Sequence, residues 1–295
     1  MAVTVPNRAQ YQDATGVRQG KAAVSMGYRG VATAWRRWKP QFEVAGQAGT
    51  DLIVGAARVE PGMSVLDIAS GAGEPALALA AAVSPRGTVT ASDLVSEMLQ
   101  TTVELASERG LDNLSFGVID GEALPFAEGS FDRVTCRTAV MHFPDPCQAL
   151  RETLRVLRPG GRAAFTALGP FEMTPAATST VGVLMQYAAP PLPAPGVPSP
   201  FRFAQPGALG AEFSAAGFHN VEETLHVVPW PWQGSAEEYL ESLPQHAWGF
   251  AELMDTVGAA QREQAVAEML AAIRQYDDGR YLCFTGPLVL VTGTR

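Results

Sequence analysis

Lysine and cysteine are scarce in this chain of 295 residues, and their scarcity limits its chemistry. Lys21 and Lys39 are its only lysines among 21 basic residues, and the motif G-x-x-x-x-G-K-[ST] is absent, which excludes a P-loop nucleoside triphosphatase. The three cysteines, Cys136, Cys147 and Cys283, are odd in number and widely spaced. They predict a reducing compartment rather than a disulfide framework. Without a C-x-x-C or H-E-x-x-H motif we expect no metal site.

Excess positive charge and long apolar runs are also lacking. The chain has 21 basic and 30 acidic residues, a net charge of −9, which disfavours nucleic acid as a partner. The longest apolar runs, such as Ala76–Val83, are far shorter than the roughly 18 residues of a membrane span. Residues 1–10 have no apolar signal core. Because 47% of the chain is hydrophobic, we expect a folded cytoplasmic protein with no membrane span.

Strand and helix patterns alternate between residues 64 and 168. The expected strands are Ser64–Ala69, Gly87–Asp93, Leu114–Ile119, Phe131–Arg137 and Arg162–Leu168. The expected helices are Pro75–Val83, Ser96–Glu108 and Pro146–Leu157, the last of which ends at the Arg158–Gly161 turn. This alternation predicts an α/β fold whose parallel sheet is covered by helices on both faces.

The rest of the chain is expected to extend this core and to cover it. A helix is predicted at Ala208–Gly217, strands at Val221–Pro229 and Tyr281–Thr292, and mostly helix over Ser235–Tyr276. The proline-rich stretch after the fifth strand favours a lid over a featureless loop. The predicted division is an N-terminal helical segment closing over the site (1–60), a core (61–169, 207–230 and 281–295) and a lid or cap (170–206 and 231–280).

A glycine-rich turn, Asp67–Pro75, follows the first strand and opens a helix. Gly71 and Gly73 let the backbone turn sharply and approach a ligand, and the helix N-terminus offers free N–H groups to an anion. Asp93 lies 20 residues after Gly73 at the end of the second strand, where a carboxylate can accept both hydroxyls of a ribose. These features fit a dinucleotide or S-adenosylmethionine; a purely structural glycine turn is the alternative.

Three features favour S-adenosylmethionine over a dinucleotide. Asp67 lies four residues before Gly71, where it can pair with the ammonium group that a dinucleotide lacks. Asp120, at the end of the third strand, can accept from an adenine amino group, and Glu122 follows it closely. A Tyr-x-x-x-Lys pair or other apparatus for hydride transfer is absent.

These residues resemble the class I S-adenosylmethionine-dependent methyltransferases, in the ubiquinone/menaquinone methylase-like branch. The motifs that carry the resemblance are VLDIASGAG (65–73), VTASDLVSEML (89–99), GVIDGEALPFAEGSFDRVTCRTAVMHFPDP (117–146) and LRVLRPGG (154–161). The resemblance implies a Rossmann-like, doubly wound sheet of seven strands with an antiparallel last strand, Tyr281–Thr292. Helical and proline-rich insertions would form a cap, and the cofactor would be S-adenosyl-L-methionine.

The resemblance also assigns residues to each part of the cofactor. The implied cofactor-binding residues are Asp67, Ser70, Gly71, Ala72, Gly73, Asp93, Leu94, Met98, Asp120, Gly121, Glu122, Cys136 and Arg137. Those of the glycine turn would line the methionine end, Asp93 the ribose, and Met98 with the acidic turn at 120–122 the adenine. Cys136 and Arg137, at the end of the fourth strand, would make backbone contacts to the methionine moiety. From its charge, the Arg137 side chain can pair with the cofactor carboxylate or an anionic substrate, with an ion pair to a nearby acid as the alternative.

Methyl transfer mainly requires that the nucleophile be aligned, and a hydroxyl acceptor also needs a base. His142 follows the fourth strand and is the candidate general base, with a capping or packing histidine as the alternative. Candidates for the substrate side or the lid are Tyr11, Tyr28, Trp35, Trp38 and His246. For each of these, packing on the sheet is the competing interpretation.

We therefore expect methyl transfer to a hydroxyl or amine of a small, apolar or aromatic metabolite. The alternatives are C-methylation of a quinone-like ring, a non-methylating S-adenosylmethionine-binding protein and, less favoured, an NAD(P)-dependent oxidoreductase. The expected partner is the small-molecule methyl acceptor, and a homodimer is left open.

Overall fold

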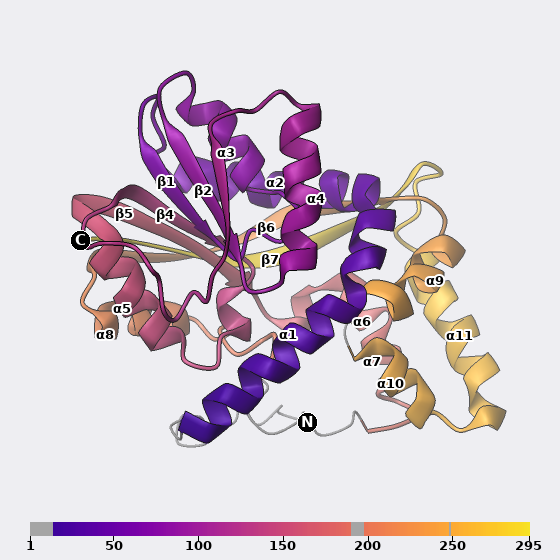
Figure 1. Cartoon of the computed structure of the whole chain (residues 1–295). Helices are drawn as coiled ribbons and strands as arrows, with labels where there is room; N and C mark the ends of the chain where they lie inside the picture. Colours follow the sequence, from indigo (N-terminus) through magenta and orange to yellow (C-terminus); the bar gives the residue numbers. More distant parts are fainter. Residues whose placement is uncertain (1–13, 190–197, 248) are drawn as a thin grey trace.

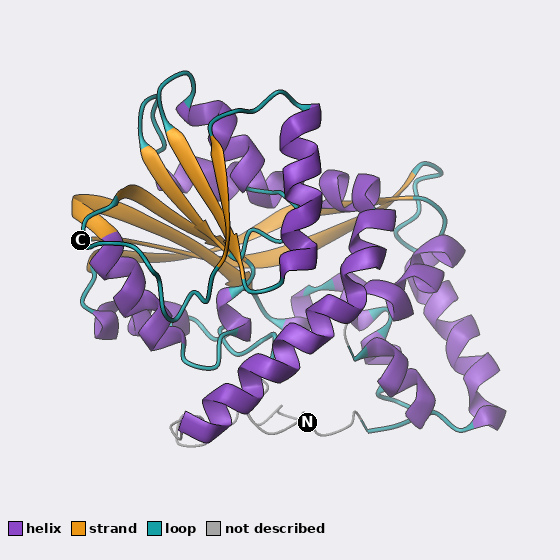
Figure 2. Ribbon diagram, viewed as in Figure 1, coloured by secondary structure: helices purple, strands orange, loops and turns teal. Residues whose placement is uncertain are grey.

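A seven-stranded sheet with helices on both faces organises the molecule (Figures 1 and 2). This computed structural model describes residues 14–189, 198–247 and 249–295. The strands are β1 (Ser64–Ile68), β2 (Thr88–Asp93), β3 (Leu114–Val118), β4 (Phe131–Arg137), β5 (Leu157–Leu168), β6 (His219–Gln233) and β7 (Tyr281–Thr294), in the order β3-β2-β1-β4-β5-β7-β6. β1 to β5 are parallel, and β7 is antiparallel to both of its neighbours. The expected doubly wound sheet with an antiparallel last strand is confirmed.

The helices fall into three groups. The N-terminal pair is α1 (Ala14–Arg37) and α2 (Lys39–Ala57); those along the sheet are α3 (Ala76–Val83), α4 (Ser96–Glu108), α5 (Pro146–Val156) and α8 (Ala208–Ala216). The outer helices are α6 (Pro175–Thr178), α7 (Val181–Leu184), α9 (Ala236–His246), α10 (Phe250–Thr256) and α11 (Ala259–Arg274). Among the described residues, no helix has the length and apolar character needed to cross a membrane.

Two apolar clusters hold the sheet and the outer helices together. The main core lies between the sheet and helices α5 and α8, where Phe165 and Phe213 are fully buried and meet edge to face at 5.3 Å. A second cluster joins α7, α9, α10 and α11 to the far ends of β6 and β7 around Trp232 and Tyr239. The outer helices therefore pack on an extension of the same sheet.

Two strand boundaries differ from the expectation by more than two residues. The α5 helix ends at Val156, one residue before its expected end, but the Arg158–Gly161 turn belongs to an irregular start of β5, where the pairing with β4 shifts register. β6 continues to Gln233 although it contains Pro229 and Pro231. It is an edge strand that pairs only with β7, so a missing N–H can be tolerated there.

The N-terminal helix α1 crosses the carboxyl ends of the first strands (Figure 1). Two ion pairs, Arg29 with Glu97 and Arg36 with Glu104, join its solvent-facing side to α4. After Arg37 the chain turns into α2 at Trp38, whose Nε1 donates to Gln245 Oε1 of α9 at 3.2 Å. Helix α1 thus spans the region where an α/β sheet binds its ligands.

Candidate active site

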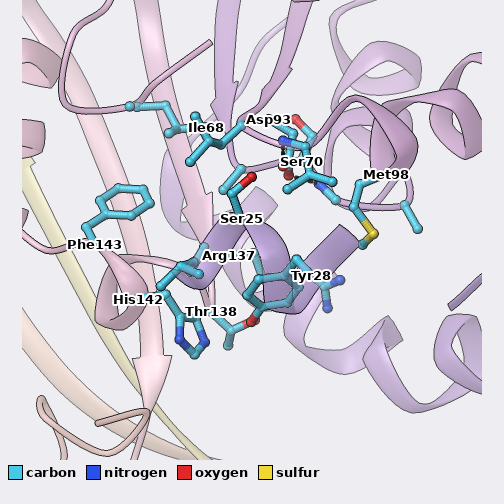
Figure 3. A pocket seen from close by; sticks show the side chains of 18 of the residues that line it. Ser25, Tyr28, Ile68, Ser70, Asp93, Met98, Arg137, Thr138, His142 and Phe143 are labelled. Carbon is cyan, nitrogen blue, oxygen red and sulfur yellow. Dashed lines mark hydrogen bonds between the residues drawn. The ribbon is translucent and has the colours of Figure 1, made fainter. Parts of the chain in front are cut away.

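A cavity lies between α1 and the carboxyl ends of β1, β2, β3 and β4 (Figure 3). The predicted residues that line it are Tyr28, Trp35, Ser70, Gly71, Ala72, Asp93, Leu94, Met98, Asp120, Gly121, Glu122, Arg137 and His142. The cavity is lined from one side by the strand ends and from the other by α1 and the start of α2. The structure therefore brings most of the predicted residues together.

Other predicted residues lie outside this lining. Asp67 is buried in β1 beneath the glycine turn, and Gly73 faces the core, where an added Cβ would lie 2.8 Å from Leu77 Cδ1. Cys136 is fully buried, and burial raises its thiol pKa well above the ordinary value, so the thiol stays protonated in the core.

Two lid candidates are also away from the cavity lining. Trp38 packs against Trp232 in the second apolar cluster, with ring centroids 5.7 Å apart. His246 lies in the same region, where its Nε2 is 2.9 Å from Ser242 Oγ and its ring meets Phe42 edge to face at 4.9 Å. Tyr11 lies outside the described residues.

The carboxylate of Asp93 joins the glycine turn to the end of β2. Its Oδ2 accepts from the Gly71 N–H at 2.9 Å, and its Oδ1 accepts from the Val95 N–H at 2.8 Å. Gly71 has a φ of +55°, a left-handed conformation that favours glycine. Burial raises the pKa of Asp93, whereas the hydrogen bonds from these N–H groups lower it. A carboxylate has about four acceptor positions, so Asp93 can still accept from a ligand.

An acid and a base lie at the opposite end of the glycine turn. Asp67 Oδ1 accepts from Thr135 Oγ1 at 2.6 Å, while its buried Oδ2 has no hydrogen-bond partner among the described residues. Arg137 donates to the carbonyl oxygens of Glu74, at 3.1 and 3.3 Å, and Gly46, at 3.4 Å. Within the described part of the chain, no carboxylate lies within 4 Å of its guanidinium. Among the described residues, Asp67 Oδ2 is therefore an unused hydrogen-bond acceptor, and the Arg137 guanidinium has no carboxylate partner.

Ionisation of Asp67 should make stability depend on pH. Burial raises the pKa of its carboxyl to about 7, although Thr135 and Arg137 lower it. The unfolded chain releases this proton near pH ~4. Because the folded state then holds more protons than the unfolded state between those values, the fold loses stability as pH rises through that window.

Asp67→Asn should remove this loss. Between pH 4 and pH 8, the free energy of unfolding of the wild type should fall relative to that of the variant by a few kcal/mol, at about 1.4 kcal/mol per pH unit. Urea unfolding at several pH values measures both, with Asp112→Asn, at an exposed position, as the control. Parallel pH profiles for wild type and Asp67→Asn would show that Asp67 titrates normally.

His142 occupies the segment after β4, in the short 3-10 helix Val140–His142. Figure 3 shows its ring beside Thr138 and Tyr28, and the Tyr28 ring meets it edge to face at 5.5 Å. Its Nδ1 is buried and has no hydrogen-bond partner among the described residues. Burial, with a smaller effect of the Arg202 charge, lowers the pKa of His142 to about 4. The imidazole is therefore neutral near pH 7 and can accept a proton.

Lys21 was not among the predicted site residues, yet it lines the cavity. Its Nζ lies 2.6 Å from Asp120 Oδ2 and 2.7 Å from Glu122 Oε2. The signal for it was the spacing: positions 21, 28 and 35 are seven residues apart and therefore share one face of a helix. The aromatic residues at two of these positions were singled out, but the lysine was not.

Comparison with known proteins identifies the domain around this cavity. The family model described as a methyltransferase domain matches residues 66–165. The chain is 29% identical to nocamycin O-methyltransferase of Saccharothrix syringae over 262 residues, which cover 79% of this chain and 85% of that protein. It is 43% identical to the ubiquinone/menaquinone biosynthesis C-methyltransferase of Hahella chejuensis over 105 residues, 35% of this chain and 42% of that protein. This chain is a class I S-adenosylmethionine-dependent methyltransferase.

The fold of this methyltransferase agrees with that conclusion. The YcgJ protein of Bacillus subtilis superposes with a TM-score of 0.55 at 23% sequence identity, covering 84% of this chain and 98% of that one. The methyltransferase prediction is thus confirmed over the oxidoreductase alternative, and S-adenosyl-L-methionine is the cofactor. The match to the C-methyltransferase spans about two-fifths of that protein's length and 35% of this chain.

Proposed function

We propose that this methyltransferase transfers a methyl group to a hydroxyl of a small, apolar or aromatic metabolite. The observation that carries this proposal is a neutral histidine in the cavity wall. His142 lines the cavity, and its Nδ1 has no hydrogen-bond partner among the described residues. A hydroxyl needs such a proton acceptor, whereas an uncharged amine can react without one. The similarity to an O-methyltransferase also extends over 79% of the chain, beyond the cofactor-binding half.

The polar groups of the cavity fit S-adenosylmethionine. Three buried polar atoms at or beneath the cavity have no partner among the described residues: Trp35 Nε1, Asp67 Oδ2 and His142 Nδ1. Leaving such an atom unpaired costs about 1–3 kcal/mol, so three around one cavity indicate that a polar ligand completes the site.

We assign each end of the cofactor to a set of these groups. Asp93 accepts the two ribose hydroxyls with its remaining acceptor positions, and Asp120 accepts from the adenine amino group. At the methionine end, Arg137 lines the cavity and suits the carboxylate, while Asp67, buried beneath the glycine turn, suits the ammonium through a bridging water, because a zwitterion needs one partner of each sign. Gly71 lets the backbone of the turn approach this ligand closely, since its left-handed φ disfavours any residue with a Cβ.

The chain's own residues then bind and orient the acceptor. When bound, S-adenosylmethionine supplies a methyl group activated by a sulfonium. His142 Nδ1 accepts the hydroxyl proton as the oxygen–carbon bond forms and holds it as an imidazolium. A pKa of about 4 suffices, because an oxygen that has gained a methyl while still carrying its proton is a far stronger acid than an imidazolium. Tyr28, Trp35, Phe42 and Phe143 give the cavity aromatic walls that exclude water and favour an apolar acceptor.

Two measurements test this proposal in sequence. Calorimetric titration should show micromolar binding of S-adenosylmethionine and S-adenosylhomocysteine, and none of a nicotinamide dinucleotide. A panel built on one aromatic scaffold, bearing a hydroxyl, an amine or an electron-rich ring carbon, is then incubated with the cofactor, and the products are identified by mass spectrometry. A methyl ether is the expected product. Exclusive N- or C-methylation would overturn the hydroxyl assignment, and cofactor binding without any transfer would place the acceptor outside the apolar and aromatic class.

A further inference from the structure

One face of α1 forms the outer wall of the cavity. Lys21, Tyr28 and Trp35 lie along this face at intervals of two helical turns, and all three line the cavity. Tyr28 reaches His142, and Trp35 stacks on Phe42 of α2 with ring centroids 4.2 Å apart. Lys21 reaches the loop that follows β3, where the adenine is assigned.

The ammonium of Lys21 bridges two carboxylates, each of which also accepts a hydrogen bond from a backbone N–H group. Asp120 Oδ1 accepts from the Glu122 N–H at 2.9 Å, and Glu122 Oε1 accepts from the Asp145 N–H at 2.8 Å. The other oxygen of each acid faces Lys21 Nζ, at 2.6 and 2.7 Å. Both acids are therefore fixed in place before any ligand arrives, and they orient the lysine.

Charge compensation keeps Lys21 in this position. The Glu122 side chain is only 4% exposed, and within the described part of the chain Lys21 is the only cation paired with it. Burial alone would lower the pKa of Lys21, but hydrogen bonds and charge attraction from Asp120 and Glu122 raise it, so the ammonium stays charged. If Lys21 moved away when a ligand bound, the buried carboxylate of Glu122 would lose its counter-ion, which is strongly unfavourable.

We propose that Lys21 is a cofactor-binding residue that fastens α1 over the adenine end of the cavity. An ammonium has three N–H donors, and the acid pair uses two of them. The third N–H donates to a ring nitrogen of the purine, while Asp120 accepts from the exocyclic amino group. This inference rests on the proposed placement of the adenine beside Asp120. It makes closure of α1 part of cofactor recognition.

The ion pairs on the other side of α1 provide a matched control. Arg36 pairs with Glu104 on the surface, where both side chains are about half exposed, and surface pairs of this kind contribute little. Lys21→Met and Arg36→Met each remove one cation from the same helix. Only the first removes a cation that lines the cavity.

The test combines calorimetry with hydrogen exchange. Lys21→Met should weaken S-adenosylhomocysteine binding by about tenfold or more, as expected for loss of a hydrogen bond from a charged donor. It should also abolish the protection that S-adenosylhomocysteine gives the amides of residues 14–37. Arg36→Met should bind within about twofold of wild type and retain this protection. Unchanged or tighter binding by Lys21→Met would overturn the proposal, because tighter binding would mean that the ammonium competes with the adenine.

Two further variants keep the result interpretable. Lys21→Met combined with Glu122→Gln removes the stranded charge along with its partner, so it should fold even if the single variant does not, and it should still bind weakly. Wild-type affinity in this double variant would also overturn the proposal.

Asp93→Ala in the same titration tests the cofactor placement itself. If Asp93→Ala loses binding while Lys21→Met does not, only the role of Lys21 fails; if Asp93→Ala binds normally, the placement fails.

Discussion

Replacing Asp93 with alanine should weaken S-adenosylmethionine binding by at least about a hundredfold. The proposed diol interaction gives the carboxylate two charge-assisted hydrogen bonds, each contributing about 1.5–3 kcal/mol. The same carboxylate also accepts from the N–H groups of Gly71 and Val95, so its loss releases the glycine turn from the end of β2. Calorimetric titration with S-adenosylmethionine measures the combined effect.

A modified ligand separates the direct contact from the structural one. The 2′-deoxy analogue of S-adenosylhomocysteine lacks one of the two hydroxyls that Asp93 is expected to bind. Wild type should bind it more weakly than the parent compound, whereas Asp93→Ala should not distinguish the two. Equal discrimination by both proteins would show that Asp93 acts only through the turn. Asp112→Ala, at an exposed position, controls for removal of an acidic side chain, and thermal unfolding checks that each variant folds.

The parts of the site that could be predicted are those fixed by local geometry. Gly71 must adopt a positive φ directly after β1, and Asp93 ends β2, so residue type and spacing alone place both at one edge of a parallel sheet. Asp120 follows β3 by the same logic, since the carboxyl ends of neighbouring parallel strands meet at one edge. Each of these positions depends only on a strand, its end and the turn that follows.

Positions that depend on distant packing could not be predicted in this way. Lys21 is 99 residues from Asp120, and only the path of α1 across the sheet brings them together. His246 was considered for the site, yet the second apolar cluster places it against Trp232 and Ser242, because α9 packs on the far ends of β6 and β7. The helical character of both segments was predictable from their composition, but the partner of each helix was not.

Replacing His142 with alanine should lower kcat for a hydroxyl acceptor by about 10²–10⁴-fold, the usual contribution of a positioned general base. Affinity for S-adenosylhomocysteine should stay within a few-fold of wild type, because His142 is assigned to the acceptor and not to the cofactor. Single-turnover assays measure the chemical step, and calorimetry measures the binding. His226→Ala is the matched control, since that histidine is half-buried on β6 outside the cavity lining, where its Nε2 is 2.8 Å from Thr224 Oγ1.

The pH dependence distinguishes a base from a residue that merely shapes the cavity. Because the pKa of His142 is about 4, its protonation should not reduce the wild-type rate as pH falls from 8 to 5. In His142→Ala a phenolic acceptor has to lose its proton to water, so the rate should rise with pH in proportion to the phenolate fraction, and added imidazole should restore part of the loss. A uniformly reduced rate that responds to neither pH nor imidazole would assign His142 a packing role. A near-normal rate would mean that the acceptor needs no base, as expected of an amine and not of a hydroxyl.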